Sequence, residues 1–504
     1  MILGVHPLLQ SLAPELVLVV GAALVMLIGL SKRRKVADSA FSIALSTMAI
    51  AAYAAYRLQQ SPPPGDATLL GDSLVSFTRL CVLGVGFLIL LVLRHVPEQE
   101  ERGEFFGLTL CAFAGIVMVA AANDLVLLFL SLELVSVPTY ILIGLSRRDI
   151  RAQEATGKYF FLGAFAAALT LYGFSFLYGA AGTTQLFGAA GSPHSIAGTI
   201  RVDLDSPLVV IGLLLSIGGL AFKIAAVPMH FYIADVYQGA ASPVTGLLGF
   251  VPKLAGFIAL IRLLSVSGWD YPDALFWLLW VMAALTMIVG NTLALWQQNV
   301  KRMLAYSSVA HTGYMLVGIT AGPALANAGR SPLRDGPTAA LFYMVIYGVM
   351  NLGAFAVLSF FRKSGPDGED SVETLDELAG AARRHRWASL ALAICVLGLM
   401  GFPLTGGFFG KFYLLTSALS VSTGNFRQNA MVVLVVIAVL NSAIAAAYYL
   451  RIVASCYLRK PAEGVRASPC RALQISIAAC ALVVLAVFLR PSILFDRARD
   501  AMDR

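Results

Sequence analysis

The stretch GGLAFKIAAVPMHFY (218–232) decides the fold, because it places a lysine, Lys223, inside a segment that is otherwise apolar. Lys223 lies too far from either end of this segment to reach water by extending its side chain. A charge near the centre of a bilayer costs roughly 2.5–3.5 kcal/mol, so such residues are rare and usually functional. Pro228 follows Lys223 and is expected to break the helix. The stretch therefore predicts a membrane helix that is interrupted beside a buried charge.

Three further stretches combine an intramembrane charge with a nearby proline or glycines. They are LLFLSLELVSVPTY (127–140) with Glu133, LLGFVPKLAGF (247–257) with Lys253 and PLTGGFFGKFYLL (403–415) with Lys411. Broken helices expose backbone dipoles and admit water, which is tolerated at membrane depth only around a cavity or a pathway. The four charged residues together indicate a conductor of protons or cations.

The composition is that of a polytopic membrane protein. Of the 504 residues, 59% are hydrophobic and only 13% are charged, whereas soluble domains carry roughly 25% charged residues. The N-terminus has no basic start and no small-residue cleavage site, so no removable signal peptide is expected. The six cysteines form no Cys-x-x-Cys pair and lie mostly in apolar runs, which argues against disulfides, iron–sulfur clusters and structural zinc.

Fourteen hydrophobic runs are long enough to cross ~30 Å of hydrocarbon. Their predicted ranges are 12–31, 38–57, 76–95, 105–122, 124–145, 156–179, 207–230, 241–265, 273–295, 303–321, 337–361, 388–419, 430–457 and 472–490. The seventh and twelfth runs are the least regular, and breaks are predicted there, near Pro228 and near Pro403–Gly410. The fold class is therefore an all-α membrane protein.

Loop charges predict the orientation of these helices. If the N-terminus is outside, the inside loops carry most of the lysines and arginines, with clusters at 32–35, 147–151, 383–386 and 459–471. Because positive residues concentrate on the inner side of a membrane, both termini are predicted to face outward, and the net charge of +8 does not suggest nucleic acid. The longest stretch outside the membrane, about 362–387, is predicted to be a solvated inner loop, with a short surface helix as the alternative.

A weak internal repeat relates the two halves of the chain. PMHFY (228–232) is similar to GKFY (410–413), and PTYILIG (138–144) is similar to TGYMLVG (312–318). The two offsets are close, at 181 and 174 residues. Helices four to eight and nine to thirteen are therefore predicted to be related units, as in many transporters.

Glu133 and Lys223 are the natural partners among the buried charges. Burial favours the neutral form of each group, whereas an opposite charge nearby favours the ionised form. A pair whose separation changes is therefore a proton switch, in which the lysine keeps its proton while the carboxylate is close and releases it when the carboxylate withdraws. A static buried salt bridge, or a polar contact between helices at Glu133, is the structural alternative.

The other titratable candidates have no such partner on their own helix. Lys253 and Lys411 have no acidic residue nearby in sequence, which suggests neutral amines that gain and lose protons through water, with a structural cation as the alternative. A secondary proton path is predicted at four further positions, namely Lys158, Glu154, His230 and His311. The Glu154–Lys158 spacing also fits a surface pair worth a few tenths of a kcal/mol, and either histidine fits a hydrogen bond between helices. No nucleotide-binding loop, haem-like histidine pair or Ser–His–Asp arrangement is present, so redox chemistry is expected elsewhere.

Five long motifs resemble those of the antiporter-like membrane subunits of bacterial NADH–quinone oxidoreductase (complex I), and among them the N type. The motifs lie at 131–145, 154–165, 222–257, 298–318 and 401–415. The N type is favoured by the DVYQGA run at 235–240, by a lysine at position 411 and by the length, since the L type would carry a long C-terminal lateral helix. The family usually has Trp-Thr-Pro before Asp-Val-Tyr and a Glu before Gly-Ala, where this chain has Tyr232-Ile233-Ala234 and Gln238.

The resemblance implies a fold, a function and a site. It implies one membrane domain over 1–504 with two inverted five-helix repeats, at 105–265 and 273–457, preceded by helices from 12–122 and followed by a last helix at 472–490. The family's proton-channel residues match Glu133, Lys223, Lys253 and Lys411, which implies a proton-translocating subunit that is driven by quinone reduction in neighbouring subunits. An Mrp-type cation/proton antiporter subunit and a hydrogenase-linked membrane subunit are the alternatives.

The resemblance also implies partners and a location. No cofactor is expected in this chain, while NADH, FMN, iron–sulfur clusters and quinone are expected in partner subunits. The expected partners are an M-type antiporter-like subunit, small K- and J-type subunits and the lipid bilayer, with no nucleic acid. The expected location is the bacterial inner membrane, with both termini periplasmic.

Overall fold

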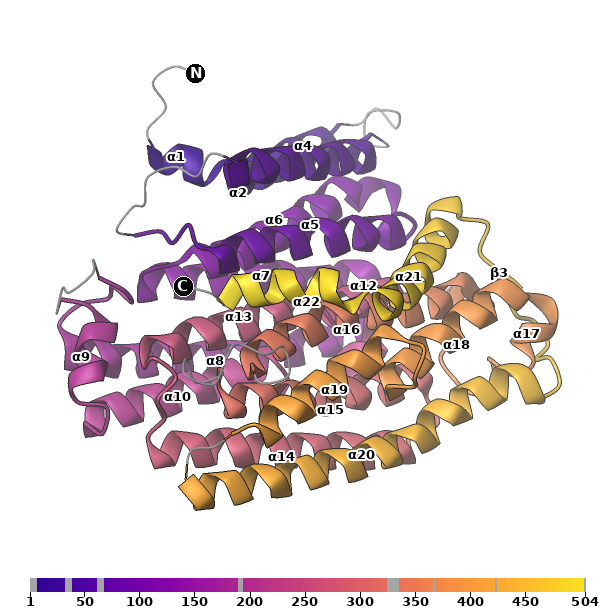
Figure 1. Ribbon diagram of the computed structural model, residues 1–504. Coiled ribbons are helices and arrows are strands. Elements are labelled where there is room, and N and C mark those ends of the chain that lie inside the picture. Colours follow the sequence, from indigo (N-terminus) through magenta and orange to yellow (C-terminus); the bar gives the residue numbers. More distant parts are fainter. Residues whose placement is uncertain are drawn as a thin grey trace.

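The computed structural model describes residues 7–31, 39–60, 68–188, 194–323, 335–365, 368–421 and 424–502. The basic cluster predicted at 32–35 lies outside these residues. The helices run along one common direction and pack side by side into a single bundle (Figure 1). The start of the bundle consists of α1 (Pro7–Ser11), α2 (Ala13–Gly29), α4 (Ala40–Gln60), α5 (Ser73–Leu93), the short 3-10 helix η1 (Gln99–Glu101) and α6 (Arg102–Ala121).

The middle of the chain forms the first group of central helices. These are α7 (Leu125–Ser146), α8 (Ile150–Ala181), α9 (Ile196–Val202), α10 (Pro207–Lys223), α11 (Ile233–Gly239), α12 (Ser242–Leu248) and α13 (Val251–Val266). Aspartates cap the first two: Asp124 accepts from the Val126 amide at 2.8 Å, and Asp149 accepts from the Ala152 amide at 2.9 Å. Such caps satisfy amides that have no partner inside the helix.

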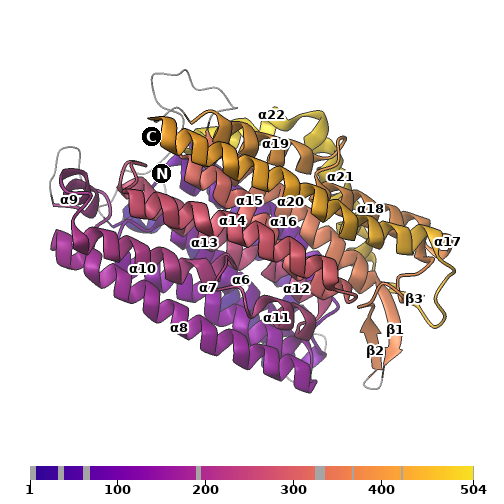
Figure 2. The same ribbon diagram turned by 90° about the horizontal axis from the view of Figure 1, so that it is seen from below.

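The second group follows in the C-terminal half. It consists of α14 (Asp273–Trp296), α15 (Val300–Ala321), α16 (Gly336–Phe360), α17 (Ala381–Arg384), α18 (Arg386–Met400), α19 (Gly406–Leu419), α20 (Gly424–Leu458), α21 (Arg471–Leu489) and α22 (Pro491–Met502). α14 and α20 lie side by side at the edge of the bundle, whereas α16 runs through its interior (Figures 1 and 2).

Two helices are interrupted inside the bundle, as the sequence predicts. α10 ends at Lys223 and α11 begins only at Ile233, while α18 ends at Met400 and α19 begins at Gly406. Pro138 behaves differently, because α7 continues through it. A membrane helix tolerates an internal proline when neighbouring groups accommodate the freed backbone carbonyl.

Ten helices within the described residues are long and apolar enough to cross a membrane. Three shorter apolar helices, α2, α10 and α18, add to these. Each predicted hydrophobic run corresponds to one helix or to an interrupted pair. The fold class is confirmed, while the count of fourteen crossings stays a prediction.

The stretch at 362–387, predicted to be a solvated loop, begins with two strands of a small antiparallel sheet and contains α17 (Ala381–Arg384) near its end, which agrees with the predicted alternative of a short helix. β1 (Phe361–Gly365) pairs with β2 (Gly368–Ser371) and with β3 (Arg466–Ala467), in the order β2-β1-β3. The sheet projects from one end of the bundle, opposite the end at which α9 and the C-terminal end of α22 lie (Figures 1 and 2). The backbone of 361–365 and 368–371 is therefore paired in the sheet.

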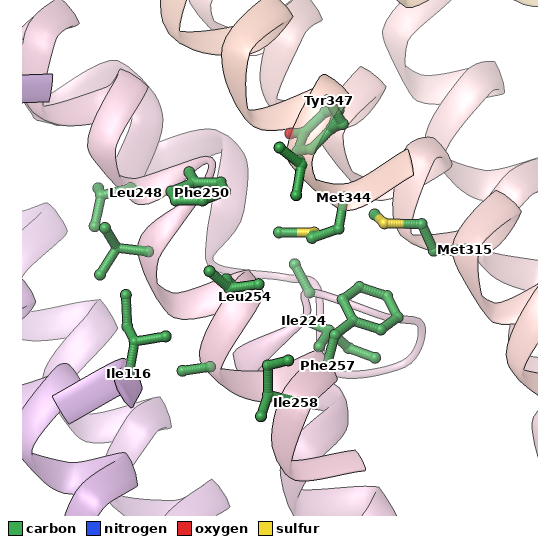
Figure 3. Packing of buried hydrophobic residues seen from close by; sticks show 14 of the residues in the cluster. Ile116, Ile224, Leu248, Phe250, Leu254, Phe257, Ile258, Met315, Met344 and Tyr347 are labelled. Atoms are coloured by element: carbon green, nitrogen blue, oxygen red, sulfur yellow. The ribbon is translucent and has the colours of Figure 1, made fainter. Parts of the chain in front are cut away.

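The most deeply buried helices are α13 and α16, and they meet at the centre of the molecule. Phe250, Leu254 and Phe257 of the α13 region lie beside Met344 and Tyr347 of α16 (Figure 3). All are at most 2% exposed. Polar side chains in this layer are consequently shielded from lipid and solvent, and they form the candidate site.

Candidate functional site

The break after α10 brings Lys223 against α7. Lys223 Nζ lies 2.9 Å from Glu133 Oε1 and also donates to the hydroxyl of Ser136. The Lys223 side chain is 5% exposed and that of Glu133 is 25% exposed. Glu133 and Ser136 are three residues apart and therefore lie on one face of α7. The predicted pair is thus an ion pair between a buried ammonium and a half-buried carboxylate.

The polypeptide between α10 and α11 is held by side chains from α14 and α15 and by its own Tyr232. The amide of Val227 donates to Thr286 Oγ1 at 2.9 Å, and the carbonyl of Ile224 accepts from Thr312 Oγ1 at 2.6 Å. The Tyr232 hydroxyl donates to the Phe222 carbonyl at 2.8 Å. These bonds satisfy backbone groups that the break leaves without helical partners.

Lys253 projects from α13 toward α15. Its Nζ donates to the Ser308 carbonyl and, at 2.9 Å, to Thr312 Oγ1, and it lies 5.6 Å from the centre of the Tyr347 ring. The residue is 1% exposed. No carboxylate pairs with Lys253 within the described ranges. Its acceptors are therefore neutral, in contrast to those of Lys223.

A small cavity connects the two lysines. It has a volume of about 10 Å³, and both Lys223 and Lys253 line it together with Tyr159, Tyr232 and Tyr237. A space of this size holds about one water molecule when polar groups surround it. The cavity therefore has room for about one water molecule beside both lysines.

His311 lies between two tyrosines beyond Lys253. Its Nδ1 is 2.7 Å from the Tyr343 hydroxyl and its Nε2 is 2.8 Å from the Tyr449 hydroxyl. Tyr449 also hydrogen-bonds Ser307. Both ring nitrogens are thus engaged, and the imidazole links α15 to α16 and α20. These contacts fit the alternative given above for His311, a hydrogen bond between helices. A proton relay would use the same nitrogen and hydroxyl atoms.

Lys411 lies at the second break. Its Nζ donates to the carbonyl of Met400 at 2.9 Å, and Met400 is the last residue of α18. The ammonium also lies 4.7 Å from the centre of the Tyr314 ring. The carboxyl end of a helix carries a partial negative charge, and a tyrosine ring attracts cations. A cation at Lys411 is therefore stabilised without a carboxylate partner.

Three of the four secondary candidates, all except His311, do not join this chain of contacts. Lys158 pairs with Glu154 at 2.6 Å and with Asp235 of α11 at 2.8 Å, and its side chain is 42% exposed. His230 lies in the first break and is buried, and its Nδ1 makes no hydrogen bond within the described part of the chain. The structure thus places Lys158 and Glu154 at the end of the bundle near the sheet, and His230 at the break.

A second polar cluster holds the end of α11, and the sequence reading missed it. Lys301 Nζ donates to the carbonyls of Gln238 and Ala240, at 3.0 and 2.6 Å. It also lies 3.4 Å from Glu373, which pairs with Arg147 at 3.0 Å. Burial alone would raise the pKa of Glu373, but Lys301 and Arg147 outweigh it, so the pKa lies below its ordinary value. The cluster ties α7, α11 and α15 together at one end of the bundle.

Other residues of the site were also missed. Ser308 and Thr312 lie near the predicted His311 on α15, and their spacing of four residues places them on one face of the helix, which is a usable signal. Tyr343 and Tyr449 come from helices distant in sequence, and a tyrosine in an apolar helix is not distinctive by itself.

Comparison with known proteins shows which family this chain resembles. The transmembrane family of NADH:quinone oxidoreductase and Mrp antiporters matches residues 122–441. A relative from Myxococcus xanthus named NADH-quinone oxidoreductase subunit N is 36% identical over 508 residues, which cover 95% of each chain.

Solved structures agree with this match. A chain of respiratory complex I from Thermus thermophilus with bound aureothin is similar with a TM-score of 0.77 and 30% identity, over 96% of this chain and 98% of that one. A chain of the Mrp complex from Dietzia sp. has a TM-score of 0.79 over 98% of this chain and 97% of that one. At 19% identity, the latter likeness shows a shared fold alone.

Proposed function

Because this chain belongs to the family of NADH-quinone oxidoreductase subunit N, we propose that it translocates protons through Glu133, Lys223, Lys253 and Lys411. It is a multi-pass membrane protein and one subunit of a multi-subunit respiratory enzyme complex. The observation that supports the proposed path best is the one-water cavity that both Lys223 and Lys253 line. A water molecule there would link two buried lysines that no direct hydrogen bond joins within the described residues.

The first step uses the ion pair of α7 and α10. Glu133, 2.9 Å from Lys223, favours the protonated form of the lysine, while burial favours the neutral form. If the carboxylate moves away, the balance shifts and Lys223 releases a proton to the water in the cavity. The broken helix suits such a change, because Lys223 is the last residue of α10 and is not held by a continuing helical turn.

The second step crosses from the first group of helices to the second. Lys253 receives the proton, and its ammonium is solvated by the Ser308 carbonyl and the Thr312 hydroxyl. His311 lies on α15, as do Ser308 and Thr312, and it passes the proton on through its hydrogen bond to Tyr343 or to Tyr449. Lys411 is the terminal acceptor, since Met400 and the Tyr314 ring stabilise a cation there.

Redox chemistry belongs to other subunits in this proposal. The described residues contain no cluster of three or more His, Cys, Asp or Glu side chains placed to hold a metal ion. NADH, FMN, iron–sulfur clusters and quinone are assigned to partner subunits, among them M-type and K/J-type neighbours in the membrane. The proposal assigns to this chain only the movement of protons that those reactions drive.

Purification of the native assembly tests the function directly. An NADH-quinone oxidoreductase subunit predicts co-purification with NADH-oxidising activity, and that activity should acidify the interior of vesicles. An assembly that exchanges cations for protons without oxidising NADH would instead identify an Mrp-type antiporter.

The orientation of the chain is part of the proposal. Asp203 caps the C-terminal end of α9 and Glu463 lies between α20 and β3, and both residues are exposed. α9 and β3 lie at opposite ends of the bundle (Figure 1). With both termini periplasmic, a single cysteine at Asp203 should react with an impermeant thiol reagent in intact cells, and one at Glu463 only after lysis. The background needs the six native cysteines replaced by alanine. The opposite labelling pattern would reverse the orientation.

A further inference from the structure

A cavity of about 460 Å³ lies far from the proton path, at the end of the bundle where α22 finishes. Its walls come from the last residues of α1, α4 and α6, from the first turns of α5 and from the C-terminal half of α22. Cavities of roughly 300–1,000 Å³ with a few convergent polar groups are typical of ligand sites. Because these helices begin or end here, the cavity lies at the level at which they leave the membrane.

Two internal ion pairs build rigid walls. Arg79 donates to Glu15 at 2.7 Å and to the Ser11 carbonyl, and both side chains of the pair are at most 10% exposed. Asp72 caps α5 and pairs with the fully buried Arg262 of α13 at 2.5 Å. The charges of Arg79 and Asp72 are therefore neutralised within the protein, although both residues line the cavity.

The remaining lining charges come from α22. Arg497 and Asp500 are three residues apart on this helix and both line the cavity. Asp500 approaches Arg499 only to 4.0 Å. Both residues are exposed, and the cavity thus offers one cation and one anion about one helical turn apart, a pattern complementary to a zwitterion rather than to a simple anion.

An apolar track leads from the cavity along the exposed side of α5. Leu80 lines the cavity and is 45% exposed, and Phe87, two turns further along the helix, is 39% exposed. Leu12 and Phe77 add apolar walls inside the cavity. An amphipathic ligand with a charged head and a hydrocarbon tail matches both parts.

We propose that this cavity binds the headgroup of a zwitterionic phospholipid of the phosphatidylethanolamine class. Its phosphate pairs with Arg497 and its primary ammonium donates to Asp500, while one acyl chain follows Leu80 and Phe87. Charge-assisted hydrogen bonds of this kind are the stronger ones. The trimethylated amine of phosphatidylcholine has no N–H to donate, so Asp500 distinguishes the two lipids.

Lipid retention by the intact complex tests the proposal. The complex is purified in mild detergent, exchanged into nanodiscs with equal amounts of phosphatidylethanolamine and phosphatidylcholine, and released for native mass spectrometry. The wild type should retain phosphatidylethanolamine on this subunit in preference to phosphatidylcholine. The double variant Arg497→Gln/Asp500→Asn should lose about tenfold in retention, whereas the control Arg490→Gln, at an exposed residue just before α22 and outside the cavity lining, should retain the lipid.

A second variant fills the cavity without changing any charge, so it tests lipid binding independently of Arg497 and Asp500. A Cβ at Gly71, which lines the cavity, would meet no atom within 4 Å, so Gly71→Phe should block the headgroup without disturbing the helices. Equal retention in the wild type, the double variant and Gly71→Phe would overturn the proposal, as would equal retention of phosphatidylcholine. Displacement of the lipid by excess free phosphoethanolamine would support recognition of the headgroup, whereas equal displacement by free phosphocholine would overturn the role of Asp500. The proton path is not tested by any of these outcomes.

Discussion

Lys411 shows how a single residue separates conduction from structure. Its ammonium is held by the Met400 carbonyl and the Tyr314 ring, and an arginine can make both contacts. A guanidinium stays charged at any accessible pH and cannot release its proton. Lys411→Arg should therefore give an assembled complex that pumps poorly, and Lys411→Met should assemble and pump poorly as well.

The measurement for Lys411 is proton uptake and NADH oxidation in the same reconstituted vesicles. A purely structural cation would give the opposite order, with the arginine variant active and the methionine variant poorly assembled. A fully coupled arginine variant would remove Lys411 from the relay.

Glu133 is expected to act through its charge on Lys223. Removing one partner of a buried ion pair leaves the other charge uncompensated, at a typical cost of roughly 3–5 kcal/mol; the 25% exposure of Glu133 places it at the low end of that range. Glu133→Ala should lower pumping and the yield of assembled complex, while Glu133→Asp should be milder. Wild-type pumping in Glu133→Ala, with normal yield, would exclude this residue from the mechanism.

At the scale of elements, the C-terminal end of α11 is held by Lys301, which pairs with Glu373 of a loop. The sequence did not predict this contact. Glu373 forms ion pairs with Lys301 and Arg147 and is 7% exposed. Glu373→Gln should destabilise the complex by about 1–3 kcal/mol, because it leaves buried cations underpaired. Asp376→Asn is the matched control, since Asp376 is on the same loop but its side chain is 89% exposed. Thermal unfolding of the purified complex measures both, and equal shifts would contradict the assigned role.

The pH dependence of this stabilisation has a definite sign. The pKa of Glu373 is lowered in the folded protein, so its contribution is present above the unfolded value of about 4.3 and is lost as the pH falls through the folded value. The difference in unfolding temperature between wild type and Glu373→Gln should thus be constant from pH 7 to pH 5 and shrink below pH 4. A difference that grows on acidification would show that Glu373 is protonated in the native state.

The elements themselves were predictable to different degrees. The breaks at 224–232 and 401–405 follow from proline and glycine, whose backbone effects are local. The sheet did not follow, because β1 pairs with β3 about a hundred residues away and neither strand has a distinctive pattern. Glu373 was predicted to lie in a solvated inner loop. Its buried partners, Arg147 and Lys301, come from segments that are distant in sequence, so the sequence did not indicate the pairing.

At the scale of the whole molecule, the charged residues of the site could be predicted, whereas their surroundings could not. Glu133, Lys223, Lys253 and Lys411 are conspicuous, since a charge in an apolar run is rare. The cavity between α10 and α13 and the tyrosines around His311 depend on how helices from both halves of the chain pack. That packing is a property of the assembled bundle.

The most direct test of the proton path is the ratio of protons moved to NADH oxidised by a complex that carries Lys253→Met. Methionine has a similar volume and no exchangeable proton, and Lys253 has only neutral acceptors to lose. Lys363→Met is the control, because Lys363 pairs with Glu377 in the sheet region, away from the path. The path predicts normal assembly, a reduced ratio or coupled rate for Lys253→Met, and wild-type values for the control. An assembled Lys253→Met complex with the wild-type ratio and rate would contradict it.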